Sequence, residues 1–157
     1  MKANTVISSF LLLIAFSCSA TDISQADKEK MISLMQDAAP YAAGMGKSGD
    51  DVCREMSNDM VIKYGNQLSK LGETPSHIRD SSYGICISAI SSAESSRSEN
   101  ELDMWKTSAL ANVDRQLQGD TRNPSPKQFL IESINNSVKI ARPFYFMKEL
   151  SIKYSSR

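Results

Sequence analysis

The sequence is poor in the side chains that most reactive sites use. Its 157 residues include one histidine, three cysteines and one tryptophan, and 18 Lys and Arg balance 18 Asp and Glu. A chain without net charge lacks the basic surface with which proteins displace counterions from nucleic-acid phosphates, so we expect no nucleic-acid partner. Seven glycines and five prolines exclude a collagen-like or low-complexity chain. The composition is that of an ordinary globular domain.

Motifs with a defined chemistry are also missing. His77 stands without a zinc-ligand spacing, a calcium loop or a glycine-rich phosphate loop, so we expect an exposed helix residue and neither a metal nor a cofactor. Four carboxylates that lie close together could act as acid and base, namely Asp50, Asp51, Glu55 and Asp59. Because no apolar surroundings separate their pKa values, a solvated helix face is the better interpretation. We therefore predict no catalytic residue and a protein that is not an enzyme.

The long apolar run that a membrane span needs is absent. Lys2 precedes an apolar segment at residues 6–16, and small residues fill positions 17–20. This order is typical of a secretory signal peptide, and a run of about eleven positions, interrupted by Ser8 and Ser9, falls short of the roughly twenty of a spanning helix. We predict a signal peptide at residues 1–20, cleaved directly after them. An uncleaved anchor helix and a lipoprotein acylated at Cys18 are the alternatives.

Cleavage would leave residues 21–157 as a single helical domain in the periplasm or outside the cell. The two remaining cysteines, Cys53 and Cys86, are an even pair in an oxidising compartment, where a disulfide is the default. If one helix ends just before a left-handed Gly65 and the next begins at Pro75, the two cysteines lie level in an antiparallel pair. The bond would close a loop of about 34 residues, and two buried free thiols are the alternative.

Apolar residues recur at three- and four-residue spacing in five segments, which predicts helices. Ser24 is a candidate N-cap for a first helix that reaches Ala39, and Ser98 with Glu101 forms a candidate capping box. The apolar stripes are Met31, Leu34, Met35 and Ala38; Val52, Cys53, Met56, Met60 and Tyr64; Cys86, Ile90 and Ala93; Leu102, Trp105, Ala109, Val113 and Leu117; and Phe129 or Leu130, Ile134, Val138 and Ala141.

Two segments leave the secondary structure open. Residues 83–90 alternate locally as a strand would, but no other segment offers a partner strand, so we favour a helix. Pro143 should kink or break the helix that begins at Ser125, leaving a last aromatic piece at residues 144–154. We predict an all-α fold, an irregular bundle of five or six helices with one disulfide.

Charge is unevenly distributed along the chain. Residues 21–121 hold 10 Lys and Arg against 16 Asp and Glu, a balance of −6, whereas residues 122–157 hold 7 against 2, a balance of +5. Three interpretations stay open: the basic helices pack on the acidic ones, they bind a protein partner, or they approach an anionic membrane or polysaccharide. The candidate partner-binding residues are the arginine, lysine and aromatic anchors Arg142, Phe144, Tyr145, Phe146 and Lys148.

Two segments carry a family resemblance. Residues 81–90 read Ser-Ser-Tyr-Gly-Ile-Cys-Ile-Ser-Ala-Ile, a cysteine among small and apolar residues, and residues 113–117 read Val-Asp-Arg-Gln-Leu before Arg-Asn-Pro at 122–124. Together they resemble the small helical periplasmic immunity proteins that block cell-wall amidases delivered by type VI secretion. The resemblance implies a helical inhibitor of a toxin and assigns no inhibitory residue.

Our first hypothesis is therefore an exported, non-enzymatic binding protein, an immunity-type inhibitor that covers the active cleft of a partner protein. The alternative is a secretion accessory or chaperone-like subunit that holds an extended client segment in a methionine-lined groove. A third hypothesis is a hydrolase that uses Asp50, Asp51 and Glu55. The expected partner is a toxin or a secretion component; a homodimer is left open, and a membrane surface is a minor candidate.

Overall fold

The structure, a computed structural model, describes residues 23–41, 47–118 and 123–155. These residues form five helices and no strand, so the all-α prediction is confirmed. The predicted signal peptide and Cys18 lie outside the described residues. The helices are α2 (Gln25–Asp37), α3 (Gly49–Ser69), α4 (Pro75–Ser95), α5 (Glu99–Gln116) and α6 (Ser125–Ser155).

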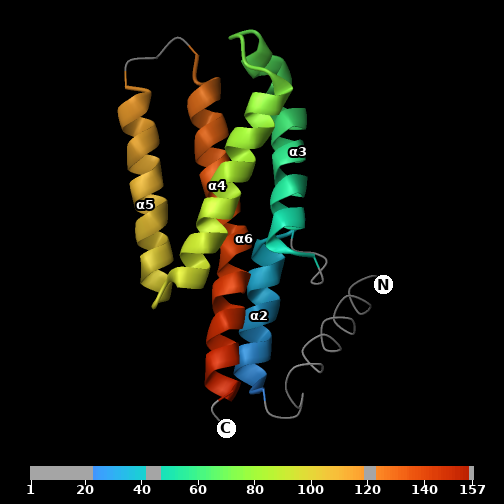
Figure 1. The fold of residues 1–157 in the computed structure, drawn as a ribbon, viewed down its shortest axis with the longest axis vertical. Coiled ribbons are helices and arrows are strands. Elements are labelled where there is room, and N and C mark those ends of the chain that lie inside the picture. The colour runs from blue at the N-terminus through green and yellow to red at the C-terminus, as the bar shows by residue number, and fades with distance from the viewer. Residues whose placement is uncertain (1–22, 42–46, 119–122, 156–157) are drawn as a thin grey trace.

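Helix α6 is the centre of the bundle, because it contacts each of the other four helices. Helix α4 crosses it and also contacts α3 and α5, whereas α2 packs on α6 and reaches α5 only through the ion pair of Lys30 with Glu99. Figure 1 shows α3, α4 and α5 around the N-terminal half of α6, and α2 beside its C-terminal half. The bundle is therefore a four-helix body to which α2 is added at one end.

The disulfide between Cys53 and Cys86 joins α3 to α4, and the predicted pairing is confirmed. The two Cα atoms are 5.5 Å apart, and both side chains are fully buried. They lie within the main apolar cluster, to which α3, α4, α5 and α6 all contribute; its buried members also include Val52, Met56, Ala89, Ile90, Ala93, Leu102, Val138, Ile140, Ala141 and Tyr145. The cross-link thus runs through the core of the body.

Buried serines allow close packing of the three central helices. Ser57 of α3, Ser82 of α4, and Ser133 and Ser137 of α6 are all fully buried. Each hydroxyl donates a hydrogen bond to a carbonyl one turn earlier in its own helix, at 2.6 to 2.9 Å. Small side chains whose hydrogen bonds are satisfied locally can be buried at little cost. These polar residues were absent from the predicted stripes.

The predicted end of α3 is wrong. The helix continues through Gly65 to Ser69, because one further turn buries Leu68 in a second apolar cluster with Tyr64 and Phe129. The left-handed residue is Gly72, with φ of 90°. Its N–H donates to the Ser69 carbonyl at 3.1 Å, and the next N–H donates to the Leu68 carbonyl at 3.2 Å, which is a Schellman motif. The level-spacing argument for the disulfide therefore started from an incorrect helix end.

The predicted capping box of α5 is incomplete. The Ser98 side chain makes no capping hydrogen bond, and the Glu101 carboxylate instead accepts from the Arg97 N–H at 2.8 Å. A complete capping box occurs at the start of α3, where Ser48 and Asp51 exchange side-chain and backbone hydrogen bonds. The predicted apolar stripe of this helix starts only at Val52, so the box four residues earlier was missed.

Other boundaries follow the sequence more closely. Ser24 caps α2 by accepting from the Asp27 N–H at 3.2 Å, as predicted, although α2 ends at Asp37 rather than Ala39. Residues 83–90 are helical, as favoured. Pro143 does not break the last helix, which is continuous as α6. Buried apolar residues on both sides of the proline hold the two halves in place and offset the lost backbone hydrogen bond.

Removal of the disulfide should destabilise the body strongly. We expect a variant with Cys53→Ala and Cys86→Ala to lose about 3–4 kcal/mol of unfolding free energy, because its unfolded chain regains the freedom of the closed loop. Urea unfolding of the variant and of the oxidised wild type measures the difference. Equal midpoints for the two proteins would show that the bond contributes nothing.

Two glycine substitutions distinguish the predicted helix end from the observed one. Gly72→Ala should cost about 1 kcal/mol, because alanine is strained at positive φ. Gly65→Ala should stabilise by about 0.5–1 kcal/mol, since the position is helical and the nearest atom to an added Cβ, on Val61, is 3.8 Å away. Thermal unfolding measures the stability of both variants. A stabilising Gly72→Ala together with a destabilising Gly65→Ala would contradict the end of α3 described above.

Candidate interaction surface

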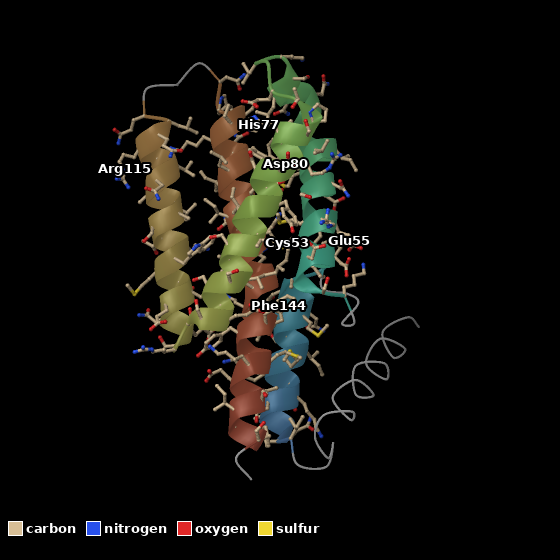
Figure 2. The ribbon with its side chains drawn as sticks, in the orientation of Figure 1. Cys53, Glu55, His77, Asp80, Arg115 and Phe144 are labelled. Carbon is tan, nitrogen blue, oxygen red and sulfur yellow. A yellow bond between two sulfur atoms is a disulfide. The ribbon has the colours of Figure 1, made fainter. Side chains whose placement is uncertain are left out.

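The candidate partner-binding residues point toward different neighbours around α6. Tyr145 and Phe146 are buried, and Phe144 packs partly buried against the main cluster, where Figure 2 shows it on α6. Arg142 and Lys148 make polar contacts with α5 and with the end of α4. The structure therefore does not gather the five side chains on one exposed face.

Arg142 ties α6 to the first two turns of α5. Its Nη1 atom lies 2.6 Å from a carboxylate oxygen of Glu99, and its Nη2 atom lies 2.7 Å from one of Asp103. The arginine side chain is only 30% exposed, so this forked contact is partly shielded from water. Acidic residues in the first turn of α5 also complement its helix dipole.

Lys148 closes the C-terminal end of α4. Its ammonium group donates to the carbonyls of Ala93, at 3.5 Å, Glu94, at 3.3 Å, and Ser96. These carbonyls have no partner within their helix, and a cation is the favourable group beside them. The same ammonium lies 4.8 Å from the centre of the Tyr145 ring. The lysine thus acts as a cap supplied by another helix.

Two more basic residues of the C-terminal third pair with the acidic part of the chain. Lys127 lies 2.7 Å from Asp114 of α5, and Lys153 lies 2.7 Å from Asp27 of α2. Together with Arg142, they account for much of the charge asymmetry as contacts between α6 and earlier helices. These contacts are those expected if the basic C-terminal third packs on the acidic helices of the same chain.

Asp27 is the most strongly perturbed of these carboxylates. It accepts hydrogen bonds from Lys153 and from the hydroxyls of Tyr154 and Ser24, at 2.7, 2.7 and 2.8 Å. These three hydrogen bonds, with that from Lys153 the largest influence, lower the pKa of Asp27 from 3.8 to about 2. The carboxylate is thus held in its charged form.

The four α3 carboxylates considered for catalysis have structural partners. Asp50 accepts from Arg54 at 2.7 Å and from the Tyr83 hydroxyl, and these bonds lower the pKa of Asp50. Asp51 belongs to the capping box, and Glu55, which Figure 2 shows on the outer side of α3, pairs with Lys47. A lowered pKa opposes the role of a general acid at neutral pH.

Asp59, the fourth of these carboxylates, has Tyr41 as its partner. Burial is the main reason why the pKa of Tyr41 is raised, and the charge of Asp59 and its hydrogen bond to the hydroxyl raise it further. His77 is exposed near the start of α4 and pairs with Glu73 one turn before it.

Within the described residues, no group of three or more His, Cys, Asp or Glu side chains could hold a metal ion. In the same part of the chain, no helix is long and apolar enough to cross a membrane.

Sequence reasoning missed one partly buried polar cluster between α3 and α6. Glu132 accepts from Lys63 at 2.6 Å and from the Tyr64 hydroxyl at 2.7 Å. Burial would raise the pKa of Glu132, but these hydrogen bonds lower it. Burial and the bond to Glu132 raise the pKa of Tyr64 to about 12. The hydroxyl therefore stays protonated as a donor, and the cluster fastens two helices together.

Exposed apolar side chains remain as candidates for contact with a partner. Ile62 of α3 is 81% exposed, and Met104 of α5 is 60% exposed. The others are Leu71, Met147 and Ile152. Ile62 lies off the apolar stripe of its helix, so a helical projection of the sequence could have identified it.

The chain matches no protein-family model, no curated protein and no solved structure. The resemblance to immunity proteins therefore stands on the sequence segments alone.

Acid should weaken the attachment of α2. Because the pKa of Asp27 is about 2 in the folded chain and 3.8 ordinarily, its contribution is complete above about pH 4 and is lost as the pH falls from 3.8 to 2. We expect about 1–2 kcal/mol of acid sensitivity from this group, absent in Asp27→Asn. Urea unfolding at several pH values between 2 and 5 measures the unfolding free energy of both proteins. The same dependence of this free energy on pH in the wild type and in Asp27→Asn would contradict the prediction.

Proposed function

We propose that this chain is an exported, non-enzymatic binding protein of the immunity type, which docks on a partner protein and covers its active cleft. The buried disulfide supports export, because such bonds persist in oxidising compartments. The carboxylates that would otherwise suggest hydrolysis serve helix capping and ion pairing. The resemblance of residues 81–90 and 113–117 to amidase inhibitors supplies the class of partner, a cell-wall hydrolase.

The observation that carries the proposal is the exposure of Ile62 on a rigid helix. An aliphatic side chain that is 81% exposed gains from burial against a partner, by about 25 cal/mol for each Å² covered. Its helix is fixed to α4 by the disulfide and to α6 by the Glu132 cluster. A preorganised surface loses little entropy on binding, which suits a tight inhibitor.

The groove-binding alternative receives less support. A methionine-lined groove needs flexible sulfur-containing side chains at the surface. Met31, Met56 and Met60 are instead buried to 1% exposure or less. Met104 and Met147 are exposed, but they lie on different helices. We therefore retain inhibition as the proposed activity.

A matched pair of surface variants tests the proposal. The oxidised protein, immobilised, should retain a peptidoglycan hydrolase from a periplasmic extract and suppress its activity. Ile62→Asp should weaken retention and inhibition by about tenfold or more, because it places a charge in the contact. Met104→Asp, an equally drastic change on α5, should leave both unchanged. Far-UV circular dichroism confirms that both variants fold.

Three outcomes would refute the proposal. The first is retention of no hydrolase by the oxidised wild type. The second is an Ile62→Asp variant that binds and inhibits as the wild type does. The third is loss of binding in Met104→Asp alone, which would place the contact on α5.

A further inference from the structure

Helix α2 packs on α6, and its other link to the bundle is the ion pair of Lys30 with Glu99 of α5, at 3.4 Å. Its apolar contact is a separate cluster made of Met31 and Leu34 from α2 and Phe146 and Leu150 from α6. Neither α2 residue belongs to the main cluster around the disulfide. Release of α2 would therefore uncover one small apolar contact and leave the core of the body complete.

Polar contacts define how α2 sits on α6. At the start of α2, Asp27 binds Lys153 and Tyr154, and the Ser24 N–H donates to the Tyr154 hydroxyl at 2.9 Å. One turn further on, Lys30 lies 4.8 Å from the centre of the Phe146 ring. We call the α6 residues that contact α2 the α6 seat; they are Phe146, Leu150, Lys153 and Tyr154. This seat is specific for a helix with the order of charged and apolar residues found in α2.

The rest of the molecule does not depend on α2 for its cohesion. Helices α3 and α4 are covalently joined, α4 and α6 pack along the main cluster, and α5 is tied to α6 by Arg142. A segment held by few buried contacts opens at a lower free energy than the whole fold. Opening of α2 should therefore cost less than unfolding of the whole bundle.

We propose that two copies of this chain exchange α2, so that the α2 helix of each copy occupies the α6 seat of the other. The contacts in the exchanged dimer are those of the single chain, so complementarity between seat and helix is already present. Eleven residues separate α2 from α3, enough to span about 35 Å when extended. Exchange of an identical element is a low-cost route to a dimer. The inference is independent of the proposed inhibitory function.

A pair of charge-reversal variants tests the exchange. In Asp27→Lys the seat residue Lys153 faces a lysine, and in Lys153→Asp the residue Asp27 faces an aspartate, so each variant alone loses the attraction. When the two are mixed, exchange creates two opposite-charge pairs in one heterodimer. Native mass spectrometry should find this heterodimer about tenfold above either homodimer, which corresponds to a preference of about 1.4 kcal/mol.

Two controls isolate the role of α2. A single chain with both Asp27→Lys and Lys153→Asp restores the pair internally and should gain no heterodimer on mixing with wild type. The variants Asp114→Lys and Lys127→Asp reverse a pair of equal length between α5 and α6, and because both keep α2 and its contacts intact, their mixture should form homodimers and heterodimer in statistical proportion. A preference for the heterodimer in this second control mixture, or no such preference in the mixture of Asp27→Lys with Lys153→Asp, would overturn the proposal.

A measurement on the unmodified chain covers the case in which a single variant fails to fold. Wild-type protein labelled with ¹⁵N is mixed with unlabelled protein at high concentration, brought to pH 2 to release Asp27, and neutralised. Exchange predicts dimers of mixed isotope content by native mass spectrometry. A sample that contains only monomers after this treatment would overturn the proposal.

Discussion

The fold depends on burial of one face of every helix against α6, with the Cys53–Cys86 bond fixing the two helices that cross it. The bond is fully buried and close to the centre of the main cluster. It limits how α3 and α4 can slide, and so fixes which of their faces meet α6. The buried serines match this arrangement, since only small side chains fit where three helices approach closely.

Much of this architecture could be read from the sequence. Helical periodicity predicted the elements, and two cysteines that follow a predicted signal peptide predicted their own pairing. The end of α3 could not be predicted, because Gly65 is a strong stop signal only where no buried residue follows; Leu68 reverses that balance. Pro143 is similar, since tertiary contacts on both sides of it outweigh the local cost.

The candidate surface was harder to predict than the fold. Arg142, Lys148 and their aromatic neighbours have the composition of an interface, and composition does not distinguish contacts within a chain from contacts between chains. The distinction lies in partners far away in sequence, such as Glu99 for Arg142. Glu132 was overlooked for the same reason, because its partners Lys63 and Tyr64 belong to another helix.

The pairing of basic α6 residues with acidic earlier helices also affects how the molecule meets others. Opposite charges that lie within 3 Å of one another cancel beyond a few ångströms, so the sequence asymmetry produces little long-range field. Diffusional encounter should then proceed without electrostatic guidance, at rates that ionic strength barely alters. Recognition by such a molecule relies on shape and apolar contact after collision.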